Sequence, residues 1–163
     1  MIYSTTRKIL EELSPFISED GLEATEELHE KEDGSGTETG DKIFLDKKNN
    51  VWFEVFENEI VLFYFTDHEH FDDYMTPPAV GEPNYIERAT DFLKRLLSLR
   101  LKKTDTVKGS DMLRVEYAFI DGDGNEEFLG GTWKMINDGA SRPQVEVSVW
   151  KFDGNKNRFE KQG

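Results

Sequence analysis

The sequence contains no cysteine among its 163 residues. This absence excludes disulfide bonds, thiolate metal sites and cysteine nucleophiles together. The chain also has no apolar run close to the roughly 20 residues that a membrane-spanning helix requires. Its first turns carry charges at Arg7, Lys8, Glu11 and Glu12, which is not typical of a signal or transit peptide. We therefore expect a cytoplasmic protein that does not bind membranes.

Short catalytic motifs are missing as well. The sequence has no G-x-S-x-G motif, no serine visibly paired with a histidine, and no glycine-rich phosphate loop before an expected helix. We therefore predict no catalytic residues and no cofactor. Enzymatic activity stays open as the less favoured alternative, because two carboxylates on separate strands can act together without any sequence motif.

Positive charge is scarce in the first half of the chain. The whole sequence has 34 acidic and 20 basic residues, a net charge of −14, and residues 1–76 hold twenty of the acids but only six Lys or Arg. Direct nucleic-acid binding is disfavoured, because a phosphate backbone needs a surface rich in Lys and Arg. An acidic half of this kind is suited to docking a basic protein partner.

The residues that are plentiful are β-branched and aromatic. Twelve phenylalanines contribute to a 12% aromatic content, which is enough to fill a core. Runs typical of strands occupy residues 42–46, 51–57, 59–66, 112–121, 126–136 and 144–152, with turn signals between them, including one at residues 137–143.

Two helices are expected beside these strands. Residues 4–13 carry one apolar stripe, and residues 84–98 carry a second after a capping box formed by Asn84 and Glu87. These patterns predict a single α+β domain over residues 1–163. We expect one antiparallel sheet of about six strands, in the order helix, three strands, helix, three strands, with the helices on one face.

Residues 18–41 form an acidic segment with ten acids and one lysine. We predict a weak helix over residues 22–31 followed by a linker, with an acidic edge strand as the alternative. The segment is expected to be mobile, which is the simplest interpretation of such a composition. As a docking surface it would present Glu23, Glu26, Glu27 and Glu30 to a basic partner.

The stretch "TDHEHFDDYM", residues 66–75, concentrates histidines, carboxylates and aromatics. On an extended backbone His68 and His70 point to the same side and, with Asp72, could bind a metal ion. The plainest alternative is a loop anchored by its aromatic residues. Among the functional interpretations we favour a partner-facing loop, because aromatic anchors within a charged rim are typical of binding hot spots. Its members are Asp67, Glu69, Phe71, Asp72, Asp73 and Tyr74.

The stretch "DGDGN", residues 121–125, begins like a calcium-binding loop. The sixth and twelfth positions of such a loop require Gly and Glu, whereas this sequence has Glu126 and Thr132 there. We therefore predict a hairpin turn, and a similar turn at residues 153–157.

An aromatic-lined pocket is the main alternative to a protein-binding surface. Trp52, Phe63, Trp133 and Trp150 could line such a pocket in a domain of the curved-sheet kind, which would then bind a small ligand or act as an enzyme. The same aromatics could equally belong to the core.

Size, lack of cysteine, acidic charge, the α+β pattern and aromatic clusters such as "VWFEVFENEIVLFYFTDHEHFDDY" at residues 51–74 give the chain a resemblance to a known group. The chain resembles the small acidic immunity proteins, or antitoxins, of bacterial polymorphic toxin systems. The resemblance implies a cytoplasmic protein without activity of its own, which binds a toxin domain, often a basic nuclease, and blocks its active site. We therefore expect a non-catalytic protein-binding domain with a basic partner.

Overall fold

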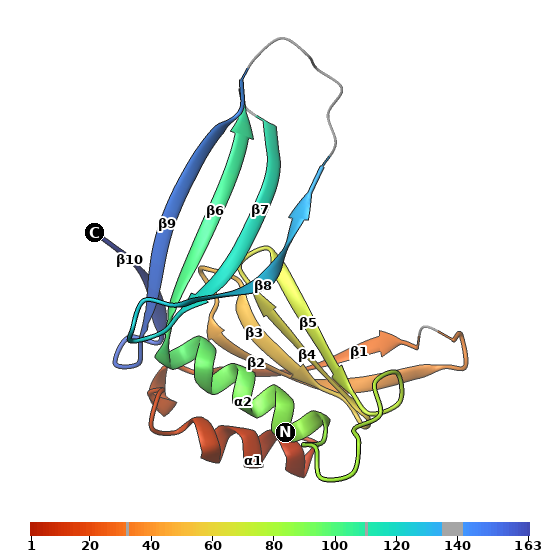
Figure 1. Ribbon diagram of the computed structural model, residues 1–163. Coiled ribbons are helices and arrows are strands. Elements are labelled where there is room, and N and C mark those ends of the chain that lie inside the picture. The colour runs from red at the N-terminus through yellow and green to blue at the C-terminus, as the bar shows by residue number, and fades with distance from the viewer. Residues whose placement is uncertain (32, 110, 135–141) are drawn as a thin grey trace. The chain divides into compact units, whose positions relative to one another are not determined.

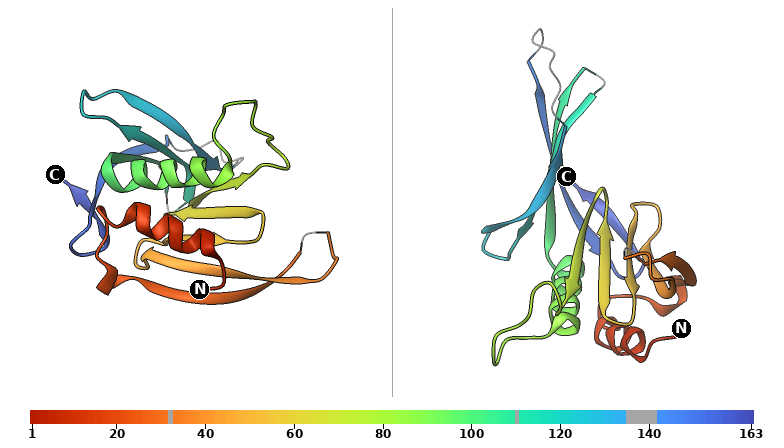
Figure 2. Two further views of the ribbon diagram at one scale, coloured as in Figure 1. Left: turned by 90° about the horizontal axis from the view of Figure 1, so that it is seen from below. Right: turned by 90° about the vertical axis from the view of Figure 1, so that its right-hand side faces the viewer.

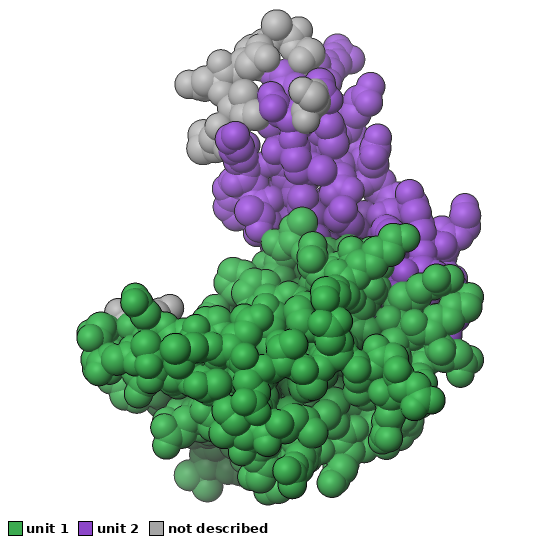
Figure 3. Space-filling view, turned by 180° about the vertical axis from the view of Figure 1, so that it is seen from behind, with its two compact units in different colours: residues 1–94, 154–158 green, residues 95–153, 159–163 purple. Residues whose placement is uncertain are grey.

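The computed structural model describes residues 1–31, 33–109, 111–134 and 142–163 (Figure 1). Over these residues the chain forms two α-helices and ten β-strands, and the strands make two five-stranded sheets. The α+β class with antiparallel strands is confirmed. The chain divides into two compact units, residues 1–94 with 154–158 and residues 95–153 with 159–163 (Figure 3). The expectation of one domain over the whole chain stays a prediction.

The first unit is a meander of consecutive antiparallel strands with helices on one side. The sheet has the order β1-β2-β3-β4-β5, and α1 and the first turns of α2 cover the same face of it (Figure 2). Its elements are α1 (Ser4–Leu13), the short 3₁₀ helix η1 (Glu19–Gly21), β1 (Glu23–Glu30), β2 (Thr37–Asp46), β3 (Val51–Val55), β4 (Glu59–Tyr64), β5 (Asp67–Asp72) and the beginning of α2 (Tyr85–Ser98).

Successive side chains of each strand point to opposite faces of this sheet, one toward the helices and one away from them. Phe53, Ile60 and Leu62 are at most 1% exposed on the helix side. The ring of Phe92 on α2 lies 5.8 Å from that of Tyr64 on β4, which places α2 on this side. Burying a large apolar side chain contributes roughly 1.5–3 kcal/mol, so this face holds the core of the unit.

The start of α1 is anchored to the sheet by a side chain from β2. The carboxylate of Asp41, which is fully buried, accepts hydrogen bonds from the backbone N–H groups of Ile2 (2.7 Å) and Tyr3 (2.8 Å) and from the Thr6 hydroxyl (2.7 Å). Ile2 and Tyr3 precede the first helical residue, Ser4, and Thr6 lies in the first turn, so these hydrogen bonds fix the path of the chain as it enters the helix. One strand residue thereby ties α1 to the sheet.

The predicted capping box at the start of α2 is confirmed. The Asn84 side chain accepts a hydrogen bond from the backbone N–H of Glu87, and the Glu87 carboxylate accepts one from the N–H of Asn84, both at 2.9 Å. Each side chain thus satisfies a donor that the helix itself leaves free.

The second unit contains the other sheet, with the order β10-β9-β6-β7-β8. The predicted strand run at residues 112–121 corresponds to β7, along which residues alternate: Val115, Tyr117 and Phe119 are buried, while Arg114 is exposed and Glu116 half-buried. The strands are β6 (Arg100–Lys108), β7 (Asp111–Ile120), β8 (Glu126–Trp133), β9 (Gln144–Asp153) and β10 (Arg158–Gln162).

The predicted hairpin turn at residues 121–125 is confirmed between β7 and β8. The Asp121 carboxylate accepts hydrogen bonds from the backbone N–H groups of Asp123 and Asn125, both at 2.9 Å. Gly124 has a φ of +85°, a conformation that glycine adopts without strain. Residues 154–157 form the corresponding turn between β9 and β10. The expected turn at 137–143 and the end of the run 126–136 lie outside the described residues, apart from 142 and 143.

Two fold predictions are wrong. The strands form two sheets of five in place of one sheet of about six, and each helix is followed by five strands in place of three. The four additional strands, β1, β5, β6 and β10, are largely charged or polar and so carry little of the apolar or aromatic pattern that predicts a strand. The weak helix over residues 22–31 is in fact the edge strand β1, paired with β2 from Glu23↔Phe44 to Glu30↔Thr37. Glutamates favour a helix locally, but cross-strand pairing overrides this weak preference.

Neither helix in the described part of the chain is long and apolar enough to cross a membrane.

Candidate functional site

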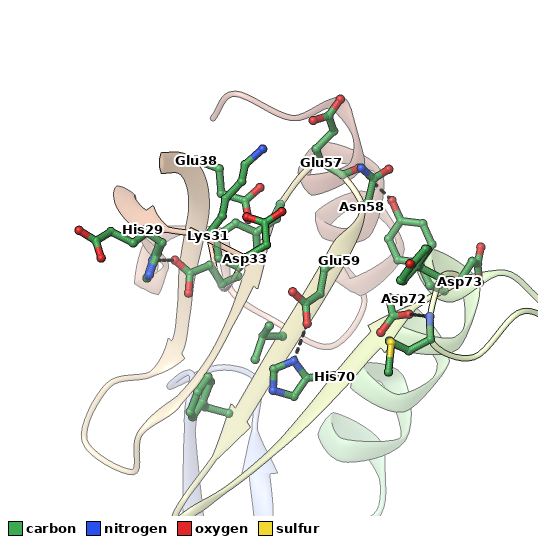
Figure 4. A pocket seen from close by; sticks show the side chains of 18 of the residues that line it. His29, Lys31, Asp33, Glu38, Glu57, Asn58, Glu59, His70, Asp72 and Asp73 are labelled. Atoms are coloured by element: carbon green, nitrogen blue, oxygen red, sulfur yellow. Dashed lines mark hydrogen bonds and ion pairs between the residues drawn. The ribbon is translucent and has the colours of Figure 1, made fainter. Parts of the chain in front are cut away.

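The face of the first sheet that points away from the helices carries a groove of about 1070 Å³ (Figure 4). Strand residues alternate between faces, so the neighbours of the buried Phe53 and Leu62 point into this groove. All lining residues belong to the first unit: His29, Glu30, Lys31, Asp33, Glu38, Trp52, Glu54, Phe56, Glu57, Asn58, Glu59, Val61, Phe63, His70, Asp72, Asp73, Tyr74, Met75 and Tyr85.

Aromatic rings stack across the strands of this face. The rings of Trp52 and Phe63 are parallel with centroids 4.0 Å apart, and Phe63 stacks in turn on His68 at 5.2 Å. The ammonium group of Lys42 lies 4.0 Å from the Trp52 ring, within range of a cation–π interaction. The face therefore offers a rigid aromatic surface that already accommodates a cation.

Carboxylates surround the aromatic surface. Eight Asp or Glu side chains line the groove in the described part of the chain, against Lys31 as the single lysine there. Figure 4 shows Glu38 and Asp33 on one side of the groove, Asp72 and Asp73 on the other, and Glu59 between them. Carboxylates gathered in a concave surface focus a negative potential that attracts cations.

Some of these carboxylates form ion pairs or hydrogen bonds with other residues of the first unit. Glu59 pairs with His70 Nδ1 at 2.5 Å, and Asp73 pairs with Arg88 at 3.2 Å. Asp72 accepts the backbone N–H of Met75 at 2.6 Å. These interactions hold β5 and the loop after it in place.

Other carboxylates have no such neighbour. The side-chain carboxylates of Glu30, Glu38 and Glu57 form no ion pair or hydrogen bond within the residues that the structure describes. Burial raises the pKa of the Tyr3 hydroxyl, and the negative charges of Glu38, Glu57 and Asp41 raise it further. Because their carboxylates have no partner among the described residues, Glu30, Glu38 and Glu57 are the acids best able to pair with an incoming cation.

A different pair lies at the β1 side of the groove. Glu54 is 3% exposed, and its Oε1 lies 2.6 Å from His29 Nε2. Burial raises the pKa of Glu54, and the hydrogen bond and charge of His29 oppose this rise. The Glu27 carboxylate lies 3.8 Å from the same His29 nitrogen and 3.2 Å from the Lys42 ammonium group. Glu27, His29 and Glu54 thus form a group, within the described residues, in which one carboxylate oxygen of each glutamate and one imidazole nitrogen lie within 4.8 Å of one another.

Large apolar side chains stand at the groove's opposite end. Tyr74 is 89% exposed and Met75 is 78% exposed, in the loop that follows β5. The Tyr85 hydroxyl donates a hydrogen bond to the Glu57 carbonyl at 3.3 Å, which ties the start of α2 to the β3–β4 turn. Exposed aromatic and methionine side chains within an acidic rim are typical of protein-binding surfaces.

The structure brings four of the ten predicted partner-binding residues into the groove, namely Glu30, Asp72, Asp73 and Tyr74. Two more, Glu23 and Glu27, lie on the face of β1 that also carries His29, and both pair with lysines: Glu23 with Lys47 at 2.9 Å, and Glu27 with Lys42 at 3.2 Å.

The remaining four have other surroundings. On β5, Glu69 and Phe71 point to the helix side: Glu69 accepts a hydrogen bond from the Tyr64 hydroxyl at 3.4 Å, and the Phe71 ring lies 5.8 Å from that of Phe92. Asp67 accepts the backbone N–H of His68, at 2.8 Å. Glu26 lies 3.3 Å from the amino group of Met1. We leave these four residues out of the binding surface.

The sequence predicted an alternative metal site at His68, His70 and Asp72. As expected, these three residues lie on the same face of β5. The two imidazole rings lie 5.1 Å apart. However, His68 stacks on Phe63, and His70 bonds to Glu59. The grouping of His29 with Glu54 was missed, because it joins residues 25 positions apart across an intervening strand.

The four aromatics proposed to line a small-ligand pocket fall into different units. Trp52 and Phe63 belong to the first unit and stack on each other. Trp133 and Trp150 belong to the second unit, where Trp133 is 65% exposed and the Trp150 indole donates to the Ser148 hydroxyl. A shared pocket stays a prediction.

No model of a known protein family matches the sequence, and neither curated proteins nor solved structures show a significant match to it. The function is therefore inferred from the groove itself.

Proposed function

We propose that the protein is a non-catalytic binding domain that takes up a basic segment of a partner protein in the groove of its first unit. The observation that carries this proposal is the composition of the groove: among the described residues, eight carboxylates and one lysine, Lys31, line it around stacked aromatic rings, and Lys42 lies over one of these rings, that of Trp52. Such a surface complements arginine and lysine side chains in both charge and shape.

Arginine and lysine have long apolar stems with charged ends. The stems can lie on aromatic surface while the charged ends reach carboxylates. Lys42 of the protein itself already does so, with its ammonium group over Trp52 and within 3.2 Å of Glu27. A partner's cations could make the same arrangement with Glu30, Glu38 and Glu57, which have no ion pair within the described residues.

The groove has room for a segment of a partner protein. Its volume of about 1070 Å³ is at the upper end of the range of roughly 300–1,000 Å³ that is usual for small-ligand pockets. The resemblance to immunity proteins suggests a basic toxin domain as the partner, and inhibition as the outcome, and both belong to this proposal. Attraction between opposite charges would speed association more than it would tighten the final complex.

Removing charge from the groove tests the proposal. The variant Glu30→Gln, Glu38→Gln, Glu57→Gln is compared with wild type for binding a library of synthetic arginine- and lysine-rich peptides, with uncharged peptides of equal length as reference. We expect the association rate at low salt to fall about tenfold or more, and its dependence on salt to flatten. Stopped-flow fluorescence measures both quantities.

The matched control removes the same charge elsewhere in the first unit. Glu11, Glu19 and Asp20 are exposed and do not line the groove. Their change to Gln, Gln and Asn should leave the association rate near that of wild type. An equal loss in both variants would show that net charge alone attracts the peptides, and the groove would then have no special role.

Tyr74 should contribute to binding without contributing to stability. Because its side chain is 89% exposed, Tyr74→Ala should change the free energy of unfolding by less than about 0.5 kcal/mol. Affinity for the tightest basic peptide should fall about tenfold, as is usual for an aromatic anchor. Val80→Ala, at a fully exposed position outside the groove, serves as control. Unchanged affinity in Tyr74→Ala would remove this loop from the binding surface.

A further inference from the structure

We infer that Glu27, His29 and Glu54 form a binding site for a divalent transition-metal ion, with Zn²⁺ as the best match. Glu27 and His29 are two residues apart on β1 and point to the same face, while Glu54 reaches them from β3. One carboxylate oxygen from each glutamate and one imidazole nitrogen lie within 4.8 Å of one another. The inference rests on this geometry and does not depend on the proposed function.

The distances suit a metal ion that is bound after small side-chain movements. His29 Nε2 lies 2.6 Å from Glu54 Oε1 and 3.8 Å from Glu27 Oε2. Zinc bonds to nitrogen and oxygen are about 2.0–2.2 Å long, and tetrahedral geometry then separates the ligand atoms by somewhat more than 3 Å. Glu54 would move slightly away from His29, and Glu27 slightly toward it.

A glycine between the two strands makes the site possible. Gly40 on β2 lies opposite Glu27 in the register of β1 and β2. A Cβ atom at Gly40 would lie 2.7 Å from Phe56 Cε1 and 3.0 Å from both Cγ and Oε1 of Glu54. The backbone of Gly40 is outside the positive-φ region, so space and not conformation requires a glycine here. The missing side chain lets Glu54 cross β2 to reach β1.

The surroundings of the three ligands also fit a metal site. Glu54 is 3% exposed although it lies on the outer face of the sheet, and a buried carboxylate needs a compensating positive charge. The Phe56 ring contacts the His29 imidazole edge to face, with centroids 5.3 Å apart, which fixes the orientation of the imidazole. Oriented ligands of this kind are typical of metal sites.

The donor set indicates which metal ion would bind. Mg²⁺ and Ca²⁺ prefer oxygen ligands alone, whereas Zn²⁺ binds imidazole together with carboxylates. Three protein ligands leave a fourth position for water or for a group of a bound partner. His29 and Glu54 line the groove, so this position would be reached from it.

Lys42 competes with the metal ion. Its ammonium group lies 3.2 Å and 3.3 Å from the two oxygens of Glu27. A metal ion would displace this pairing, and Lys42 could keep its position over Trp52. Lys42→Met should therefore strengthen zinc binding, because it removes the competing cation and leaves a side chain of similar length.

The test is a calorimetric titration of the full chain with zinc chloride. We expect one Zn²⁺ per chain, and at least a tenfold weaker affinity in His29→Gln and in Glu54→Gln. The matched control is His70→Gln, because His70 also pairs with a glutamate in the groove but has no third ligand grouped with it in the described residues. This control should bind zinc as wild type does.

A second readout separates loss of the site from loss of the fold. Circular dichroism identifies any variant that fails to fold, and the visible absorption of bound Co²⁺ reports the ligand environment in those that do fold. Absence of zinc binding by the folded wild type would overturn the inference. So would zinc binding that survives in both His29→Gln and Glu54→Gln, or that is lost in His70→Gln but retained in His29→Gln.

Discussion

The Asp41→Ala variant should lose about 3–5 kcal/mol of the free energy of unfolding. Asp41 is fully buried, and its carboxylate accepts three hydrogen bonds of 2.7–2.8 Å at the start of α1. Alanine would leave two backbone N–H groups and the Thr6 hydroxyl without this acceptor. Each buried donor left without its acceptor costs about 1–3 kcal/mol, and three hydrogen bonds are lost, although water can reach the donor of the half-exposed Ile2.

Urea denaturation followed by circular dichroism measures this loss. Asp41→Asn keeps one acceptor oxygen in the same place, so its loss should be smaller, about 1–2 kcal/mol. Glu26→Gln is the control on the neighbouring strand, where a half-exposed carboxylate should contribute little. A loss below about 1 kcal/mol in Asp41→Ala would show that water replaces the carboxylate at no great cost.

Asp41 should also make the stability of the protein depend on pH at the acidic end. Burial acts to raise the pKa of Asp41, but the hydrogen bonds from Ile2, Thr6 and Tyr3 outweigh it and hold the pKa below the ordinary value of 3.8. Because the folded-state pKa is lower than the unfolded one, the contribution is fully present above the unfolded value. It is lost as the pH falls through the folded pKa.

The difference in stability between wild type and Asp41→Asn isolates this contribution. The difference should be constant above about pH 5 and should shrink as the pH falls below 3.8. Denaturation curves at several pH values provide the measurement. A difference that stays constant into the acidic range would mean that Asp41 titrates alike in both states.

The Gly40→Ala variant should lose about 1–3 kcal/mol of stability, together with the geometry of the Glu54–His29 pair. The added methyl group would meet the Phe56 ring and the Glu54 side chain at 2.7–3.0 Å, so both must move. Overpacking of this kind usually costs 1–3 kcal/mol. The zinc affinity of this variant should fall in parallel, because Glu54 would no longer cross β2 freely.

Gly122→Ala provides the matched control for this substitution. Gly122 lies in a turn where an added Cβ would have none of the described residues within 4 Å, and its φ is not positive. The same change there should be neutral or slightly stabilising, since alanine restricts the unfolded chain. If Gly40→Ala were as stable as Gly122→Ala and bound zinc like wild type, the absence of a side chain at Gly40 would be needed neither for stability nor for zinc binding.

The elements that could be predicted from the sequence are those with local signals. Alternating apolar residues identified β7, and the Asn84 and Glu87 pair identified the start of α2. The strand β6 has no such pattern, since its sequence RLKKTDTVK is largely charged or polar. It is nevertheless held between β7 and β9, with Lys102 paired to Glu126 at 2.8 Å. Pairing with neighbours, not burial of alternating apolar residues, determines that strand.

In the candidate site, too, only residues that are close together in the sequence could be grouped from the sequence alone. Asp72, Asp73 and Tyr74 are adjacent in the sequence, so their grouping was visible before the structure. Glu54 and His29 meet only because β1 and β3 flank β2. The role of Gly40 as an open space depends on the register of β1 on β2, which no local pattern encodes.

The most direct test of the groove is to map the contact surface of a bound basic peptide by NMR. Backbone amide shifts of the labelled protein are recorded as an arginine-rich peptide is added. Binding in the groove predicts the largest shifts on β1 to β5 at the residues that line it, including Glu30 and Glu38, and in the loop that contains Tyr74 and Met75. Shifts concentrated on α1 or on the strands of the second unit, with the groove unchanged, would contradict it.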